Sequence, residues 1–268
     1  MLKTILITGA STGFGRIAAD ILHDKGHKIY GTSRNPAKHN CDFQLLKLDT
    51  CDGDSISSAV HHVLEVEGKI DVLINNAGRA MYGAIEEASE QNIIELFETN
   101  VFGLMKVTSE VLPAMRKQKS GRIINVTSLA GITPTPSLGI YSATKHAVEG
   151  YSKCLKFELE QFGIDVLLVK PGEFMTQVFA NSIKPDNKID DYKKFRDLIQ
   201  SQMDNRTPDN VLEPSAVGAL IANLVDEENP KLDNLIGPYS DLFPDILTQP
   251  EQLYEAVRGA YQLHSLVP

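Results

Sequence analysis

Residues Thr4–Gly15 read TILITGASTGFG and decide the fold of this 268-residue chain. The first five are apolar or β-branched and carry no charge, which predicts a strand buried on both faces. A glycine turn follows. Apolar residues then recur at helical spacing from Arg16 to Lys25, and Gly26 supplies a stop signal. Lys28–Ser33 has the composition of a second strand. The order strand, glycine turn, helix, strand predicts a βαβ unit.

The same alternation continues along most of the chain and predicts a doubly wound parallel α/β sheet of about seven strands with helices on both faces. Without a repeat or a break in composition, one domain over residues 1–268 is expected, with a substrate-loop region at 173–210 and a helical tail at 240–268. The further expected strands are Phe43–Leu48, Asp71–Asn75, Arg122–Thr127, Ile164–Val169 and Leu232–Gly237. The further expected helices are Ser55–Glu67, Ser89–Lys117, Tyr141–Phe162, Asp190–Met203, Glu213–Val225 and Glu251–Leu263.

Composition excludes several classes of protein. A net charge of −9, from 26 basic and 35 acidic residues, argues against a nucleic-acid or anionic-membrane partner. The three cysteines form no metal-ligand spacing and no disulfide framework, so we expect no metal and buried or incidental thiols. No apolar run approaches 18 residues, and the apolar N-terminus is too short for a signal peptide. These features predict a soluble, cytoplasmic protein.

The glycine turn predicts a nucleotide site. Its spacing, with Gly9, Gly13 and Gly15, differs from the common Gly-x-Gly-x-x-Gly fingerprint and lacks the Lys-Ser/Thr ending of a P-loop. At the start of a helix, such glycines let the backbone approach a pyrophosphate, and the free N–H groups of the helix favour an anion. The alternative is a tight turn that only improves helix packing.

The end of the second strand indicates which nucleotide would bind. An NAD site usually places an acid there for the ribose 2′-hydroxyl, whereas an arginine accommodates a 2′-phosphate. This strand ends in Ser33 and Arg34, with no acid. The sequence therefore favours NADP(H) over NAD(H). The alternative is that Arg34 is an ordinary loop cation.

Tyr141 and Lys145 are four residues apart in an expected helix, so they share one face. A free tyrosine has a pKa near 10, and a nearby cation would lower it. The pair is therefore a candidate for proton transfer, although the same spacing is common on solvated helix faces.

With these pieces in order, residues 3 to 176 resemble the short-chain dehydrogenase/reductase family, and Thr32–Pro36 resembles its hydroxysteroid- and retinol-dehydrogenase-like branch. The resemblance implies a Rossmann-like fold and a set of cofactor-binding residues. The set is Gly9, Ser11, Thr12, Gly13, Phe14, Gly15, Ser33, Arg34, Asp49, Asn76, Ala77, Gly78, Tyr141, Lys145, Pro171, Gly172 and Thr176. Phe14 stands where the family more often has a branched aliphatic residue.

The resemblance also implies four catalytic residues. Tyr141 would pass a proton to or from the substrate oxygen. Lys145 would lower the pKa of that tyrosine and hold the nicotinamide ribose. Ser128 would hydrogen-bond the substrate oxygen, and Asn100 would hold a water that relays protons to Lys145.

The expected function is hydride transfer between NADP(H) and a ketone, aldehyde or alcohol. A non-catalytic NADP(H) sensor is the alternative from another class, and a nucleotide-sugar epimerase is disfavoured by the glycine spacing and the short region after Pro171. Several apolar residues are expected either to line an apolar substrate pocket or to pack in the core: Phe174, Met175, Val178, Phe179, Met81 and Tyr82. By analogy with the family, we expect a homodimer or homotetramer.

Overall fold

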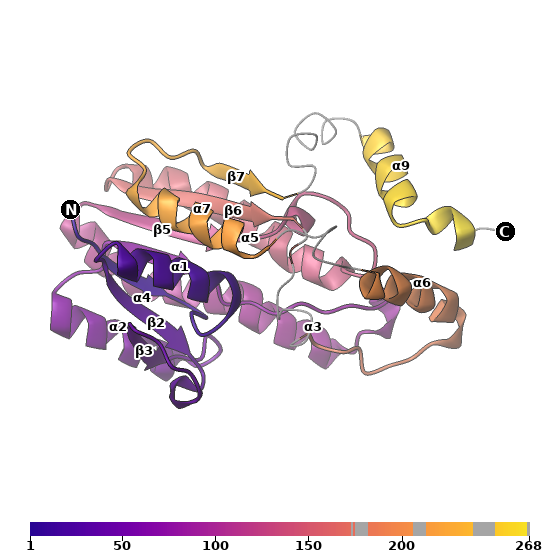
Figure 1. Ribbon diagram of the computed structural model, residues 1–268, viewed down its shortest axis with the longest axis horizontal. Helices are drawn as coiled ribbons and strands as arrows, with labels where there is room; N and C mark the ends of the chain where they lie inside the picture. Colours follow the sequence, from indigo (N-terminus) through magenta and orange to yellow (C-terminus); the bar gives the residue numbers. More distant parts are fainter. Residues whose placement is uncertain (173, 175–181, 206–212, 238–249, 267–268) are drawn as a thin grey trace.

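The computed structural model describes residues 1–172, 174, 182–205, 213–237 and 250–266. Seven parallel strands form one sheet in the order β3-β2-β1-β4-β5-β6-β7 (Figure 1). This arrangement confirms the predicted doubly wound, Rossmann-like α/β fold. The strands are β1 (Thr4–Ile7), β2 (Lys28–Ser33), β3 (Gln44–Lys47), β4 (Val72–Asn75), β5 (Gly121–Val126), β6 (Ile164–Pro171) and β7 (Asp233–Ile236).

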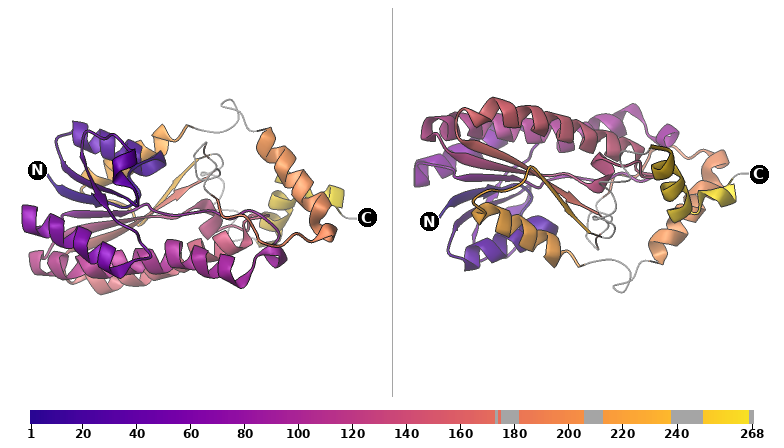
Figure 2. Two further views of the ribbon diagram at one scale, coloured as in Figure 1. Left: turned by 90° about the horizontal axis from the view of Figure 1, so that it is seen from below. Right: turned by 90° about the horizontal axis from the view of Figure 1, so that it is seen from above.

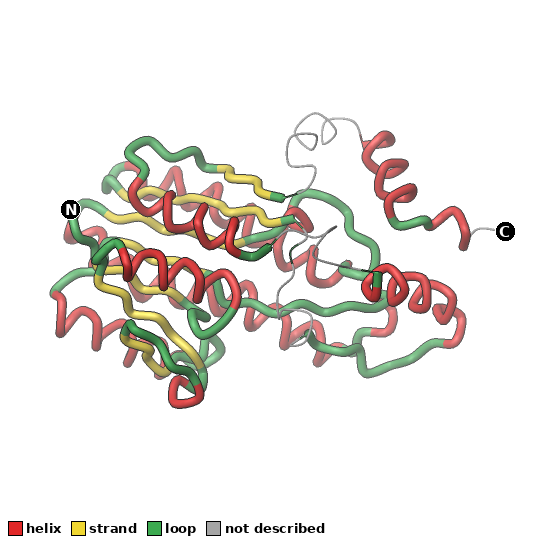
Figure 3. The backbone as a smooth tube through the Cα atoms, viewed as in Figure 1, coloured by secondary structure: helices red, strands yellow, loops and turns green. Residues whose placement is uncertain are grey.

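Helices cover both faces of the sheet (Figures 2 and 3). On one face α1 (Gly13–Asp24) packs beside α7 (Ser215–Asp226). On the other lie α2 (Gly53–Glu67), α4 (Gly103–Gln118) and α5 (Gly139–Glu160). Strand β1 is buried along its whole length, because apolar side chains on each of its faces meet one of these helix layers.

The strand order reverses beside β1, which pairs with β2 on one side and with β4 on the other. Ligands of open α/β sheets bind outside the carboxyl ends of the strands at such a switch point. Helices α6 (Lys193–Asp204) and α9 (Pro250–Ala260) lie beyond this end of the sheet, away from the N-terminus (Figure 1). None of the helices in these described ranges is long and apolar enough to cross a membrane.

The long helical stretch predicted over Ser89–Lys117 is present, but it is not a single α-helix. The segment consists of α3 (Glu90–Phe97), a π-helical turn (Glu98–Phe102) and α4. A π-turn closes its hydrogen bonds one residue further along the chain than an α-turn does, and the apolar pattern alone did not distinguish the two. Close packing follows it directly, because a Cβ on Gly103 would lie 2.7 Å from the Cβ of Thr50. π-Turns occur often at functional sites, and this one contains Asn100.

The remaining differences are at element boundaries. Helix α1 begins at Gly13 rather than Arg16, so the second and third turn glycines belong to its first turn. The tail helix α9 ends at Ala260 and is followed by a 3-10 turn over Leu263–Leu266. Of the three cysteines, Cys41 is half-buried, and Cys51 and Cys154 are exposed, which agrees with the alternative of incidental thiols. That the chain is a single domain with the predicted loop and tail regions stays a prediction.

Candidate active site

Ser128 and Tyr141 meet where β5 ends and α5 begins. Ser128 lies two residues after the end of β5, and its hydroxyl accepts a hydrogen bond from the backbone N–H of Ala130 at 3.1 Å. Its Oγ also lies 3.5 Å from the carbonyl oxygen of Pro171, at the end of the neighbouring strand β6. Tyr141 lies in the first turn of α5 and forms a hydrogen bond with Ser128. Burial raises the pKa of Tyr141 to about 12, and the Ser128 hydrogen bond opposes part of that shift. The phenol is therefore protonated at neutral pH.

Lys145 lies one helical turn after Tyr141, with its ammonium beneath the tyrosine ring. Its Nζ is 5.6 Å from the centre of the Tyr141 ring and donates a hydrogen bond to the carbonyl oxygen of Val126 at 3.0 Å. Burial lowers the pKa of Lys145 to about 8, and the charge of Glu149 opposes this shift.

The electrostatics of the pair differ from the sequence expectation. Lys145 was expected to lower the pKa of Tyr141, yet the group that lowers it in the structure is the hydroxyl of Ser128. The geometry gives a reason, since the ammonium faces the ring and is engaged with the Val126 carbonyl. Burial of the phenol outweighs the Ser128 hydrogen bond, so the pKa of Tyr141 is raised.

Asn100 connects the π-turn to this pair. Its side-chain oxygen accepts a hydrogen bond from the backbone N–H of Arg79 at 2.8 Å. Its amide nitrogen donates to the Arg79 carbonyl at 2.9 Å and to the hydroxyl of Thr144 at 3.1 Å. A Cβ on Gly78 would lie 3.3 Å from Asn100 Oδ1 and 3.7 Å from Lys145 Nζ. The structure thus brings Asn100, Gly78 and Lys145 together.

The glycine turn is fixed against the loop that follows β4. The side-chain amide of Asn76 donates to the carbonyl oxygens of Thr8 and Gly9, each at 3.0 Å. The hydroxyl of Thr8 accepts hydrogen bonds from the N–H groups of Asn76 and Ala77, each at 3.0 Å. A Cβ on Gly15 would lie 2.4 Å from Asn76 Nδ2, so this position requires glycine.

The opposite side of the turn is open. Gly13 has φ +60°, and a Cβ placed there would meet no atom within 4 Å. Thr12 is exposed at the N-cap of α1, and the half-buried Ser11 precedes it. The first N–H groups of a helix lack intrahelical acceptors and form its positive end. A helix start that glycine leaves bare on this side fits a pyrophosphate.

The predicted ribose and adenine contacts lie at the ends of the neighbouring strands. Ser33 is buried at the end of β2, and its hydroxyl accepts a hydrogen bond from the N–H of Asn35 at 3.2 Å. Arg34 is the next residue and is exposed. The carboxylate of Asp49, after β3, accepts a hydrogen bond from the N–H of Cys51 at 3.0 Å. Since β3, β2 and β1 are adjacent in the sheet, these residues lie on the same side of the switch point as the glycine turn.

The segment after β6 meets the glycine turn through aromatic rings. Pro171 ends β6, and the N–H of Gly172 donates to the Ile236 carbonyl at 2.8 Å. Phe174 is 3% exposed and packs edge-to-face on Phe14, with ring centres 5.7 Å apart. Phe174 therefore belongs to the core. Thr176, Met175, Val178 and Phe179 lie outside the described residues.

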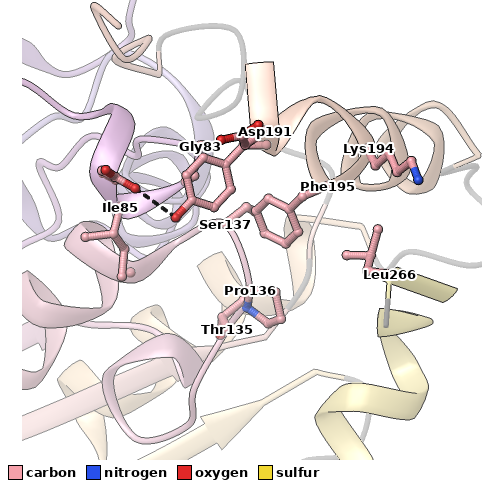
Figure 4. Close-up of a pocket in the computed structure, with 13 residues that line it drawn as sticks. Gly83, Ile85, Thr135, Pro136, Ser137, Asp191, Lys194, Phe195 and Leu266 are labelled. Carbon is pink, nitrogen blue, oxygen red and sulfur yellow. Dashed lines mark hydrogen bonds between the residues drawn. The ribbon is translucent and has the colours of Figure 1, made fainter. Parts of the chain in front are cut away.

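A cavity of about 660 Å³ adjoins the N-terminus of α5 (Figure 4). Pro136, Phe195 and Leu266 supply apolar walls, while Asp191 and Lys194 supply charge. The cavity contacts Gly139, two residues before Tyr141. Of the pocket residues proposed from sequence, the described Met81, Tyr82 and Phe174 do not line this cavity. Met81 is buried against Leu96 and Ile183, in a cluster that also contacts Tyr141.

Glu87 attaches the α6 segment, residues 182–205, to the loop after β4. Its carboxylate is 1% exposed, accepts hydrogen bonds from the N–H groups of Ala84 and Ile189, and pairs with Arg196. A second connection is the bridge between Met81 and Ile183.

Sequence reasoning missed Glu87, Thr8 and Thr144. Only Thr8 carried a signal, since it ends the first strand directly before the glycine turn.

The comparisons with known proteins agree with this geometry. A family model described as short chain dehydrogenase matches residues 3–187. The chain is 38% identical over 242 residues to the 3-ketodihydrosphingosine reductase of Bacteroides thetaiotaomicron, covering 88% of each chain. It is 31% identical over 203 residues to the NADPH-dependent 3-dehydrocapnine reductase of Ornithobacterium rhinotracheale, covering 71% of this chain and 72% of the other.

A solved short-chain dehydrogenase from Streptomyces avermitilis superposes on the chain with a TM-score of 0.79 at 33% identity, covering 98% of this chain and 97% of that one. Both the family match and this level of identity exceed what a shared fold alone would produce. The chain therefore belongs to the short-chain dehydrogenase family and is an oxidoreductase that interconverts a carbonyl compound and an alcohol.

Proposed function

We propose that the chain is an NADP(H)-dependent reductase of an apolar ketone, with Ser128, Tyr141, Lys145 and Asn100 as its catalytic residues. The observation that carries this proposal is the contact of a protonated Tyr141 with Ser128, above the ammonium of Lys145. The bound nicotinamide would supply the hydride.

Each side chain then has a defined task. Tyr141 holds the proton that the substrate oxygen needs as it gains negative charge. Ser128 donates a hydrogen bond to the same oxygen and stabilises its developing charge. Lys145 supplies positive charge beneath the phenol and a donor for the ribose hydroxyls of the cofactor. Asn100 fixes the loop at Arg79, and its oxygen has a second lone pair for the proposed relay water.

The cofactor would lie across the switch point. The open face of Gly13 and the start of α1 would receive the pyrophosphate, and Asp49 and the loop at Asn76–Gly78 would line the adenine and nicotinamide sides. Pro171 and Gly172, with Thr176 beyond the described residues, would close over the nicotinamide. Ser33 and the exposed Arg34 would bind a 2′-phosphate. The relative named as NADPH-dependent supports this preference.

The relative named 3-ketodihydrosphingosine reductase supports a ketone substrate and the reductive direction. The cavity beside α5, with its apolar walls, supports an apolar substrate. A homodimer or homotetramer and a cytoplasmic location stay predictions from the sequence.

The test is turnover of purified protein with NADPH or NADH and a panel of ketones from short polar compounds to 3-ketodihydrosphingosine. We expect oxidation of NADPH with the apolar ketones and a loss of about 10²–10⁴-fold in kcat for Tyr141→Phe. Tight NADPH binding without turnover of any ketone would favour the non-catalytic sensor.

Arg34→Ala tests the cofactor preference. Because a charge-assisted contact to the 2′-phosphate would be lost, we expect NADPH affinity to fall about 10-fold or more, with NADH affinity nearly unchanged. Isothermal titration with both cofactors measures this, and equal losses would mean that Arg34 does not contact the phosphate.

A further inference from the structure

A buried carboxylate that the proposed mechanism does not use lies next to Lys145. Glu149 follows Lys145 by four residues on α5, so the two side chains share a helix face. Glu149 is 3% exposed and Lys145 is 5% exposed. An ionised carboxylate is rarely buried to this extent unless it is paired, because removing it from water costs several kcal/mol.

Glu149 is paired on several sides. The hydroxyl of Thr127 donates a hydrogen bond to its Oε1 at 2.7 Å. The ammonium of Lys170 on β6 lies 2.8 Å from its Oε2 and also pairs with Asp233 on β7. Lys153 on α5 is more distant, with its Nζ 3.5 Å from Oε2. Thr127, Glu149, Lys170 and Asp233 form the Glu149 cluster.

Two residues of the Glu149 cluster directly precede residues of the candidate active site. Thr127 comes immediately before Ser128, and Lys170 comes immediately before Pro171, whose carbonyl oxygen lies 3.5 Å from Ser128 Oγ. The two strand ends therefore share one carboxylate, and that carboxylate lies one helical turn from the catalytic ammonium.

The charge of Glu149 acts on Lys145 in the direction that catalysis needs. Burial alone drives an ammonium toward its neutral form. The pKa of Lys145 is lowered by burial to about 8, and the negative charge of Glu149 raises it. A neutral Lys145 would give the phenol and the ribose no positive charge.

A purely structural role would not require this charge. Replacing a buried ion pair with apolar residues of similar size is often neutral or stabilising. Lys170 and Glu149 are nevertheless buried as ions behind the site, although an apolar pair would join β6 to α5 as well.

We propose that Glu149 is a positioning residue that keeps Lys145 protonated near neutral pH, held in place by Thr127 and Lys170. The proposal rests on the proposed function only in taking Lys145 as the working cation. It predicts that the charge of Glu149, rather than its shape, sets the alkaline limit of activity.

The first experiment needs no turnover. The protein is labelled with [¹³Cε]lysine, the Lys145 signal is assigned with Lys145→Met, and its titration is followed by NMR. Removing the opposite charge in Glu149→Gln should lower the midpoint of Lys145 by about one pH unit. Lys153→Gln, which removes the distant exposed partner, should leave the midpoint in place. A midpoint unchanged in Glu149→Gln would overturn the proposal.

The second experiment is the pH dependence of kcat. Because Tyr141 stays protonated to about pH 12, the fall at alkaline pH should follow Lys145 and should move to lower pH in Glu149→Gln. Activity at pH 8.5 should then fall about fivefold more than activity at pH 6.5, consistent with a shift of about one pH unit. An equal loss at every pH would indicate a structural role and would refute the proposal.

Two further variants keep the result interpretable. If Glu149→Gln does not fold, the double variant Glu149→Gln with Lys170→Met removes both buried charges, and its Lys145 midpoint should lie below that of Lys170→Met alone, because these two variants differ only at Glu149. Glu149→Asp restores the charge and should return the midpoint toward that of the wild type. If the wild type turns over no ketone, the proposed function fails, while the NMR titration still decides the role of Glu149.

Discussion

Two regions of the molecule, the end of the sheet that carries the catalytic residues and the α6 segment that lines the cavity, are held in different ways. The catalytic floor, formed by the carboxyl ends of β1, β4, β5 and β6, is fixed by backbone pairing within the sheet and by buried polar side chains. The α6 segment is attached through side chains and one bridge: the carboxylate of Glu87, the bridge between Met81 and Ile183, and hydrogen bonds that join Asp186 to Ser89 and Asn92 and Tyr192 to Glu86.

The two kinds of attachment suit two different tasks, precise proton transfer in the catalytic floor and adaptable substrate recognition in the α6 segment. Proton transfer requires donor and acceptor to be held within hydrogen-bonding reach, and the sheet provides that rigidity. Recognition of a substrate tolerates looser attachment, and segments with few buried contacts are the ones that open most easily. Substitutions in the catalytic floor should therefore act by disturbing close packing or a buried charge. A substitution in the α6 segment should act by removing one of the contacts that attach the segment.

The largest effect is expected from Gly15→Ala in the floor. Its Cβ would lie 2.4 Å from Asn76 Nδ2 and 2.8 Å from the carbonyl oxygen of Gly9, and Asn76 cannot move without losing two hydrogen bonds. We expect the free energy of unfolding to fall by about 2–3 kcal/mol, measured by urea denaturation, with loss of NADPH binding.

Gly150→Ala is the matched control for that change. Gly150 is exposed in the middle of α5, and its Cβ would meet no atom within 4 Å. Alanine there should stabilise the protein by up to about 1 kcal/mol. If both substitutions changed the free energy of unfolding by similar amounts, the catalytic floor would not be rigid.

Lys145→Met tests the energetic cost of the buried charge in the floor. The pKa of Lys145 falls from 10.5 to about 8 on folding, which corresponds to about 3 kcal/mol of destabilisation near pH 7. Losing the hydrogen bond to Val126 offsets about 1 kcal/mol. We therefore expect an inactive variant that is about 2 kcal/mol more stable at pH 7.

The sign of the pH dependence provides a check on that estimate. Between pH 8 and 10.5 the folded wild type binds fewer protons at Lys145 than the unfolded chain, so this group makes the wild type more stable as pH rises. The advantage of Lys145→Met should shrink from pH 7 to pH 9.5 in urea denaturation. A constant advantage would show that lysine burial is not its source.

Glu87→Gln should have the smallest effect and should act on the α6 segment alone. It removes the charge that pairs with Arg196 and leaves one oxygen, so only one of the N–H groups of Ala84 and Ile189, which bond to different oxygens of Glu87, keeps its acceptor. We expect KM for the ketone to rise about fivefold to tenfold, with kcat and NADPH affinity unchanged. Hydrogen exchange should quicken in residues 182–205. Glu65→Gln, on the exposed side of α2, is the control and should change neither.

The sequence predicted the parts of the fold that depend on local pattern. The uncharged run in β1 and the glycines after it were sufficient for the βαβ unit, because burial on both faces and a tight turn each leave a mark on composition. The π-turn at Asn100 was not anticipated, because apolar periodicity indicates a helix without distinguishing a π-turn from an α-turn. Phe174 was equally ambiguous from sequence, and its contact with Phe14 places it in the core.

The sequence by itself determined which chemical groups this protein possesses: a glycine-lined helix start, a strand end with Ser33 and Arg34 but no acid, and a tyrosine and lysine one turn apart. Tertiary structure decided their electrostatic state. Burial keeps Tyr141 protonated and lowers the pKa of Lys145. Glu149 opposes the second effect, and it is held in a cluster formed by α5, β6, β7 and the loop after β5. Desolvation depends on everything packed around a group, so no spacing along the chain could have predicted it.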